Sequence, residues 1–99
     1  MSFAATSHFY RLEGTYLRAQ CKDQHGHVHE STLNLDEVLG NSEGRFDPRG
    51  SGFAGSASMY GLNGHTLVAR LRSSDGNHHD AHIDLNSCVR NDNGRLERA

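Results

Sequence analysis

The chain has 99 residues, of which 34% are hydrophobic and 22% are charged, and its formal net charge is −2 at pH 7. A chain of this length forms at most one domain with a small core, which buries roughly 60–65% of the unfolded surface. The charges form no basic stripe and no segment approaches the ~18 apolar residues of a membrane span, so we expect neither nucleic acid nor a membrane as partner.

In chain order, the first half predicts three strands, a helical turn and a hairpin. The runs "FYRLEG" and "TYLRAQCK" alternate between apolar and polar residues and meet at Glu13-Gly14, a hairpin signal. The turn "DQHG" leads into a third strand, "HVHESTLNL", whose Leu33 and Leu35 mark the core face. After it, "NLDEVL" is typical of a single helical turn, and "NSEGR" predicts a hairpin with Gly44 in a left-handed conformation.

The second half repeats the first at a constant offset of 50 residues. Residues 2–46 align without a gap with residues 52–96, and Asn63-Gly64 provides the strongest hairpin signal. Each copy has about 50 residues, too few for a secure core. We therefore predict a single all-β domain over the whole chain, with pseudo-twofold symmetry, in which repeat 1 (2–49) and repeat 2 (50–99) share one core.

The segment "HGHVH", His25 to His29, raises the question of a metal site. Histidines at alternate positions of a strand share one face, and imidazole is a ligand for zinc and copper. Only His29 and His79 align between the repeats, on the parity of Leu33 and Ile83, and no Cys or carboxylate stands beside them at a recognisable metal spacing. We favour the interpretation that these histidines are exposed side chains of a strand and bind no metal. A metal-binding or structural interaction module is kept as the alternative function.

No catalytic arrangement is recognisable in the sequence. Cys21 lies in an alternating strand and Cys88 in the apolar slot of a helical turn, where both are expected to fill core space as free thiols. A nucleophile elbow, a phosphate loop and paired carboxylates are all lacking. We expect no enzymatic activity and no cofactor. The N-terminal residues lack the features of a secretory signal, so we expect a cytoplasmic protein, with export by a non-classical route as the alternative.

The repeated pattern resembles the cyanovirin-N homology (CVNH) family of sugar-binding proteins. The first copy supplies Phe3, Thr6, "LEGTYLRAQC", Gly26 and "LNLDEVLGNSEGRF", and the second supplies Phe53, Ser56, "LNGHTLVARL", Gly76 and "IDLNSCVRNDNGRL". The resemblance covers essentially the whole chain. It implies triple-stranded sheets and β-hairpins with short 3-10 turns, elements exchanged between the repeats, and a lectin of the fungal type. The implied ligand is α1→2-linked mannose of high-mannose glycans, so the implied partners are mannose-rich oligosaccharides or glycoproteins, including fungal cell-wall glycans.

The resemblance also implies two carbohydrate sites. The preferred site takes Asn41, Ser42, Glu43, Ser51, Gly52, Ser56, Arg72, Ser73 and Ser74. The second site takes Ser2, Thr6, Lys22, Asp23, Gln24, Asn91, Asp92 and Asn93. Amides, carboxylates and hydroxyls on rigid turns suit vicinal sugar hydroxyls, and Gly26 and Gly76 mark turns whose rims we expect to contact sugar. Asn41 and Asn91 also suit turns, because Asn bonds its own backbone, and the two roles are compatible.

Departures from the family pattern change three expectations. Ser7 and Ala57 stand where each repeat usually has the first cysteine of a disulfide, so the family disulfides cannot form. Lys22 replaces a common acidic residue, which makes the second site less complete. The junction "FDPRGSGF" has Pro48 in place of a frequent Trp and is rich in glycine, so we expect a flexible hinge and either a monomer or a domain-swapped dimer. Its "RGSG" is compatible with a natural linker or with the scar of a removed module.

Overall fold

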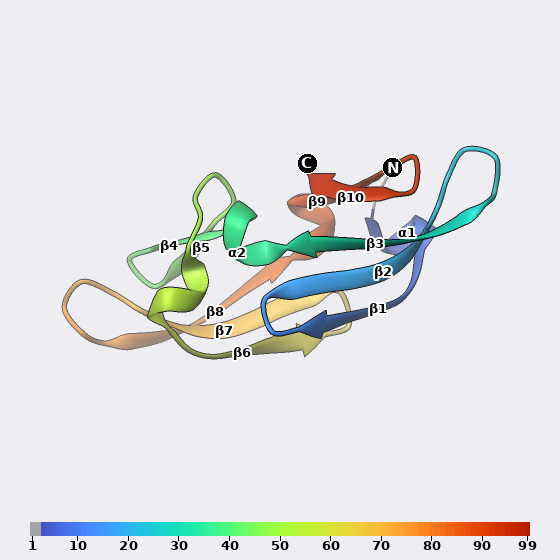
Figure 1. Cartoon of the computed structure of the whole chain (residues 1–99). Coiled ribbons are helices and arrows are strands. Elements are labelled where there is room, and N and C mark those ends of the chain that lie inside the picture. Colours follow the sequence, from blue (N-terminus) through green and yellow to red (C-terminus); the bar gives the residue numbers. More distant parts are fainter. Residues whose placement is uncertain (1–2) are drawn as a thin grey trace. The chain divides into compact units, whose positions relative to one another are not determined.

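Antiparallel strands make up most of the fold (Figure 1). This computed structural model describes residues 3–99. The elements in chain order are α1 (Phe3–Thr6), β1 (Ser7–Glu13), β2 (Tyr16–Lys22), β3 (Val28–Asn34), α2 (Leu35–Val38), β4 (Gly40–Ser42), β5 (Arg45–Asp47), the 3-10 turn η1 (Phe53–Ser56), β6 (Ala57–Asn63), β7 (Thr66–Arg72), β8 (His78–Asp84), the 3-10 turn η2 (Leu85–Ser87), β9 (Val89–Asp92) and β10 (Arg95–Arg98). The strands pair as the sheets β1-β2-β3 and β6-β7-β8 and as the hairpins β4-β5 and β9-β10, so the all-β prediction is confirmed.

The chain forms two compact units, and each unit takes elements from both sequence repeats. Unit 1 comprises the chain up to Asn34 together with Leu85–Ala99, and unit 2 comprises Leu35–Asp84. Repeat 1 gives unit 1 its three-stranded sheet and gives unit 2 the β4-β5 hairpin, whereas repeat 2 does the reverse. Figure 1 shows this in unit 1, where the sheet is coloured from blue to green and the β9-β10 hairpin lies at the red end of the scale. The predicted exchange of elements is therefore confirmed.

The central strand of each sheet separates a buried face from an exposed one. In β7, Leu67, Ala69 and Leu71 are buried, whereas Val68 and Arg72 between and beyond them are exposed. In β2, the buried residues are Leu17, Ala19 and Cys21. Because side chains alternate along a strand, this burial turns the basic side chains of β7 outward, toward solvent.

An aromatic residue at the start of each repeat completes the core of a unit. Phe53 begins η1 and is fully buried, with its ring centroid 5.4 Å from that of Tyr60 and 5.5 Å from that of Phe46. Phe3 begins α1 in unit 1 and packs on Tyr10, with ring centroids 4.9 Å apart. The sequence pattern did not indicate these two helical turns, because four residues are too few to show a helical period.

The hairpin loops of the two sheets lie one residue beyond the pair that the sequence indicated. Asn63 pairs with Thr66, so the two-residue loop is Gly64-His65, and Asn63 is the last residue of β6. Gly64 has φ 62°, and a left-handed glycine as the first loop residue is typical of a type II′ turn. The first hairpin has the equivalent loop, Gly14-Thr15. The hairpins were predicted correctly, but Asn63-Gly64 is not itself the loop.

The junction between the repeats is hydrogen-bonded within unit 2. The backbone N–H of Gly52 donates to the carbonyl oxygen of Asp36 at 2.6 Å, and that of Phe53 donates to Leu39 at 3.1 Å. The Asp36 carboxylate also accepts the N–H of Ala54 at 2.9 Å, which satisfies a donor at the start of η1. These bonds hold one end of the segment that the sequence predicts to be a flexible hinge, and domain swapping through it stays a prediction.

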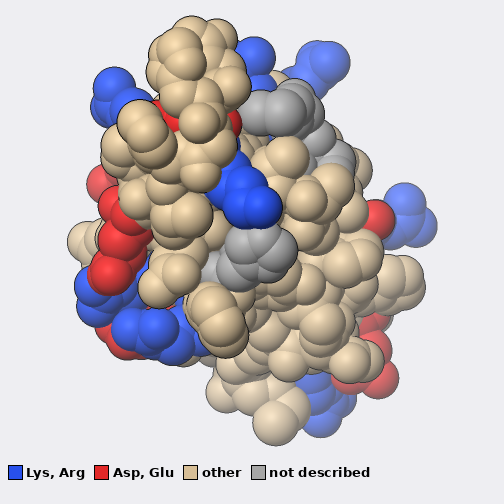
Figure 2. All heavy atoms as spheres, turned by 90° about the vertical axis from the view of Figure 1, so that its right-hand side faces the viewer, with Lys and Arg blue, Asp and Glu red and all other residues tan. Residues whose placement is uncertain are grey.

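The surface carries charges of both signs. On the face in Figure 2, basic and acidic side chains are interspersed among uncharged ones, as the small formal net charge of −2 leads one to expect. Within residues 3–99, no helix is long and apolar enough to cross a membrane.

Candidate functional site

A polar hollow of about 480 Å³ lies in unit 2. Three segments border it: the β4-β5 hairpin, the end of η1, and the turn that follows β7. Its lining residues are Asn41, Glu43, Ser56, Arg72, Ser73, Ser74 and Gly76. Amide, carboxylate, hydroxyl and guanidinium groups thus converge on one open surface.

The β4-β5 hairpin positions the carboxylate of Glu43. The loop residues Glu43 (φ 51°) and Gly44 (φ 85°) are both left-handed, as a type I′ turn requires. A left-handed conformation costs a residue other than glycine about 1 kcal/mol. Hydrogen bonds offset this cost, because the Glu43 carboxylate accepts the hydroxyl of Ser74 at 2.9 Å and its N–H at 3.3 Å. The hairpin is thereby bonded to the turn on the other side of the hollow.

Asn41 joins all three segments that border the hollow. Its side-chain N–H groups donate to Ser56 Oγ and to the carbonyl oxygen of Arg72, both at 2.7 Å. Its side-chain oxygen accepts the N–H of Gly44 at 2.8 Å. Both amide protons are therefore used within the protein, and one lone pair of the oxygen remains. These bonds give Asn41 the turn-forming role that the sequence offered as one of two readings, and its contact with sugar stays a prediction.

The turn after β7 is fixed by internal hydrogen bonds. The N–H of Ser73 donates to the carbonyl oxygen of Asn77 at 2.9 Å, and the Ser73 hydroxyl donates to the Asp75 carboxylate. That hydroxyl, followed by the backbone N–H of Asn77, lowers the pKa of Asp75 below its ordinary value. Arg72 is exposed and forms no ion pair within residues 3–99. The groups that remain for a ligand are the Arg72 guanidinium, the Glu43 carboxylate and the Ser74 hydroxyl.

The structure brings most of the preferred site together but places three of its predicted residues elsewhere. Ser42 is exposed on β4 and does not line the hollow. Ser51 and Gly52 do not line it either, because the backbone of this segment packs on Gly40 and bonds to Asp36. Gly76, which marks a turn whose rim is expected from the sequence to contact sugar, does line it.

The second predicted site has an equivalent frame in unit 1. The side-chain N–H groups of Asn91 donate to Thr6 Oγ1 and to the carbonyl oxygen of Lys22, both at 2.9 Å, and its oxygen accepts the N–H of Gly94 at 2.8 Å. Asn93 (φ 52°) accepts the N–H of Gln24 at 2.8 Å, in the place where Glu43 contacts Ser74 in unit 2. Asp92 is exposed on β9, and Ser2 lies outside the described residues.

Asp23 anchors the turn of this second site. One carboxylate oxygen accepts the N–H groups of His25 and His27, both at 2.9 Å, and the other lies 2.7 Å from Nε2 of His29. The His29 hydrogen bond, assisted by the two backbone N–H groups, lowers the pKa of Asp23 from 3.8 to about 2. With 10% of its side chain exposed, Asp23 is a turn anchor whose oxygens are already occupied.

Acid is therefore expected to weaken unit 1 through Asp23. Ionised Asp23 stabilises the folded state fully above pH 3.8, and this contribution is lost as the pH falls to about 2. Between these values, the free energy of unfolding of the wild type should fall more steeply than that of Asp23→Asn, measured by urea unfolding at a series of pH values. Asp80→Asn, at a side chain that is 93% exposed, is the matched control. Parallel curves for the wild type and Asp23→Asn would contradict this role.

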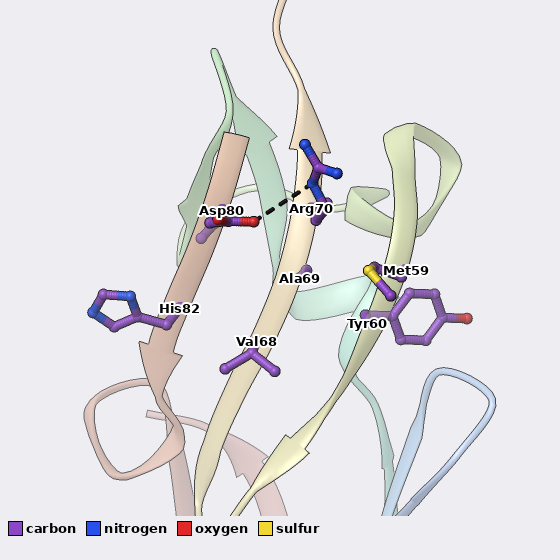
Figure 3. A pocket seen from close by; sticks show the side chains of 8 residues that line it. Met59, Tyr60, Val68, Ala69, Arg70, Asp80 and His82 are labelled. Carbon is purple, nitrogen blue, oxygen red and sulfur yellow. Dashed lines mark ion pairs between the residues drawn. The ribbon is translucent and has the colours of Figure 1, made fainter. Parts of the chain in front are cut away.

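A second, apolar hollow of about 330 Å³ lies on the sheet of unit 2 (Figure 3). Met59 and Tyr60 lie on one side of it and His82 on the other. The Arg70–Asp80 ion pair lies at one end and Val68 at the opposite end. The hollow contains no array of amides and hydroxyls, and thus suits sugar hydroxyls less well than the polar one.

The same position in unit 1 is covered by charged side chains. Arg18 stands where repeat 2 has Val68, and its guanidinium pairs with Glu13 at 3.1 Å and also with Glu30. The apolar hollow is therefore a feature of repeat 2 and is not required by the fold.

The geometry offers no support for the metal-binding alternative. His29 is turned to Asp23, and the rings of His25 and His27 have centroids 6.3 Å apart. Among the side chains that the structure describes, no group of three from His, Cys, Asp and Glu is placed to hold a metal ion. Cys21 and Cys88 are buried and are not disulfide-bonded, and burial raises the pKa of Cys21, which disfavours its reactive thiolate.

Comparisons with a family model and with solved structures lead to the same protein family, over nearly the whole chain. The model of the CVNH domain matches residues 3–97. A designed cyanovirin-N homolog lectin, LKAMG, shares 34% sequence identity with a TM-score of 0.93, and each chain is covered over 100% of its length. GzCVNH from Gibberella zeae shares 36% identity with a TM-score of 0.90, with 97% of this chain and 95% of that chain covered.

A more distant structure, described as a Microvirin:mannobiose complex, has 21% identity and a TM-score of 0.80, with 99% of this chain and 98% of that chain covered, and shows the shared fold. No curated protein sequence matches this chain.

Proposed function

We propose that this chain, which belongs to the CVNH family, is a non-catalytic lectin that binds α1→2-linked mannose of high-mannose glycans. The observation that carries the proposal is the polar hollow in unit 2, where donors and acceptors are held on a rigid frame. Its partners would be mannose-rich oligosaccharides or glycoproteins, such as those of fungal cell walls. A structural relative with 34% identity, described as a lectin, supports the sugar-binding class.

The exposed groups of the hollow match the hydrogen-bonding needs of a pyranose. Vicinal hydroxyls both donate and accept, so one can donate to the Glu43 carboxylate while its neighbour accepts from the Arg72 guanidinium. The Ser74 hydroxyl, already donating to Glu43, can accept a further hydrogen bond. Asn41 fixes the three segments before the sugar arrives, which reduces the ordering cost of binding.

Binding at a single hollow is expected to be weak. The surface is open and polar, so every hydrogen bond to sugar replaces one to water. Unit 1 contains its own Asn91-centred frame, and a second site on the same chain would raise the avidity for a branched glycan without any new contact.

The test is an NMR titration of backbone amides with α1→2-mannobiose. We expect shifts at residues 41–44 and 72–76 in the wild type. Glu43→Ala should weaken binding at this hollow at least about tenfold, because it removes a charged acceptor and the bonds to Ser74. Glu43 is the better first target, since Asn41→Ala would also break the frame that shapes the hollow.

Val68→Arg is the matched control for the location of the site. The substitution introduces the residue type that repeat 1 has at the aligned position, Arg18. It changes the lining of the apolar hollow and leaves the polar hollow as it is. Mannobiose affinity should stay at the wild-type value. Wild-type amides that fail to respond to millimolar mannobiose and to GlcNAc oligomers would refute the lectin proposal, and shifts around Val68 in place of Glu43 would refute the assigned site.

A further inference from the structure

His79 lies where the two sides of the polar hollow meet. A Cβ atom added at Gly44 would lie 2.5 Å from Cδ2 of His79, so the imidazole ring packs directly on the backbone of the β4-β5 hairpin. On the other side, Nε2 of His79 lies 3.0 Å from the hydroxyl oxygen of Ser73. One exposed side chain of β8 thus contacts both the hairpin and the turn that line the hollow.

The hydrogen-bond network fixes the direction of the His79–Ser73 bond. The only hydroxyl proton of Ser73 is donated to the Asp75 carboxylate. Ser73 Oγ must therefore accept from His79, which places a proton on Nε2. His79 acts as a donor to the turn, while the edge of its ring packs on Gly44.

Unit 1 contains the same arrangement around the aligned histidine. A Cβ atom added at Gly94 would lie 2.7 Å from Cδ2 of His29, and Nε2 of His29 lies 2.7 Å from the Asp23 carboxylate. A carboxylate only accepts, so Nε2 is again the donor. The turn residue differs between the units, whereas the histidine, the hairpin glycine and their contact are the same.

Core packing does not account for these histidines. The His29 side chain is 51% exposed and His79 is also exposed, so neither buries much apolar surface. What each one does is hold a hairpin against a turn. In unit 2, these are the two segments whose separation decides whether Glu43 and Ser74 can contact one ligand together.

We propose that His79 is a positioning residue for the polar hollow of unit 2, and that His29 has the same role in unit 1: each fastens the hairpin to the turn and so sets the geometry in which sugar is bound. This rests on the proposed lectin function. It assigns a role to the one histidine of "HGHVH" that recurs in the second repeat.

The test uses two substitutions that separate the effect of the ring contact with Gly44 from that of the hydrogen bond to Ser73. His79→Ala removes both the ring and the donor, whereas His79→Phe keeps a ring on Gly44 and removes only the bond to Ser73. We expect mannobiose affinity at unit 2 to fall about five- to tenfold in the alanine variant and less in the phenylalanine variant. His82→Ala, on the same strand and outside the polar hollow, should bind as the wild type does.

A spectroscopic signature reports the contact without any sugar. The His79 ring should shift the Gly44 Hα resonance by its ring current, and this shift should vanish in His79→Ala and persist in His79→Phe. A folded His79→Ala variant that loses the shift yet binds with wild-type affinity would overturn the proposal. If wild-type protein binds no glycan, the lectin function fails, while the Gly44 shift and faster amide exchange at residues 73–77 in His79→Ala still decide whether the fastening exists.

Discussion

Gly44→Ala is expected to lower the free energy of unfolding by about 3 kcal/mol and to weaken sugar binding at unit 2 by about tenfold. Two costs add up. Gly44 has φ 85°, where an alanine suffers roughly 1–2 kcal/mol of left-handed strain. In addition, the new Cβ would lie 2.5 Å from the His79 ring, which must move away and break its contact with the turn. Urea unfolding and mannobiose titration measure the two effects.

Gly76→Ala separates backbone strain from steric clash. Gly76 has nearly the same φ, 86°, but a Cβ there would meet nothing within 4 Å. The free energy of unfolding of Gly76→Ala should therefore fall only by the cost of the backbone strain. In the double variant Gly44→Ala, His79→Ala, the clash is absent, so the two substitutions should couple by about 1 kcal/mol or more. Equal destabilisation by Gly44→Ala and Gly76→Ala, without coupling, would show that the His79 contact has no energetic weight.

Ser7→Cys is expected to form a disulfide with Cys21 and to stabilise the oxidised protein by about 3 kcal/mol. Ser7 and Cys21 are direct partners in the β1-β2 register, both are buried, and Ser7 Oγ lies 3.4 Å from Cys21 Sγ. A bridge would close a loop of about 15 residues, and the loss of unfolded-state entropy gives an effect of that size. The native serine contributes only a weak hydrogen bond to sulfur at the same place.

The reduced form of the same variant is the control, because it differs from the oxidised form only in the bond. Thermal unfolding with and without reductant, together with a thiol count, measures the effect. The reduced variant should unfold near the wild-type temperature and the oxidised one well above it. Two titratable thiols at residues 7 and 21 after oxidation, or a bridge without a rise in unfolding temperature, would contradict the prediction.

Local pattern was sufficient to predict the strands of this chain and the helical turns that follow β3 and β8, but not the helical turns α1 and η1. The offset of 50 between repeats, the alternation in β2 and β7, and the glycines of the hairpins depend on neighbouring residues, whose spacing in sequence equals their spacing on a strand. The error at Asn63-Gly64 was one of register. Pairing across the sheet, which local preference does not specify, made Gly64 the first loop residue and left Asn63 in the strand.

The composition of the site was predictable in part. The resemblance named Glu43, Arg72 and Ser74, which line the polar hollow together. It also named Ser51 and Gly52, whose backbone is engaged with Gly40 and Asp36. A residue type at an aligned position does not show whether its polar groups are free, because that depends on partners remote in sequence.

The sequence by itself determined that this chain is a duplicated all-β protein of the CVNH family with polar residues on its turns, since repeats, alternation and turn residues are properties of short segments. Only the tertiary structure decided what those residues do. Asn41 became a frame and His79 a contact between hairpin and turn, because folding brings together segments from opposite repeats around them. Asp23 became an anchor through hydrogen bonds within its own turn. Of the histidines that first suggested a metal site, His29 packs on Gly94, and its counterpart His79 packs on Gly44. Each glycine is remote in sequence from its histidine, and its missing side chain leaves room for the imidazole ring.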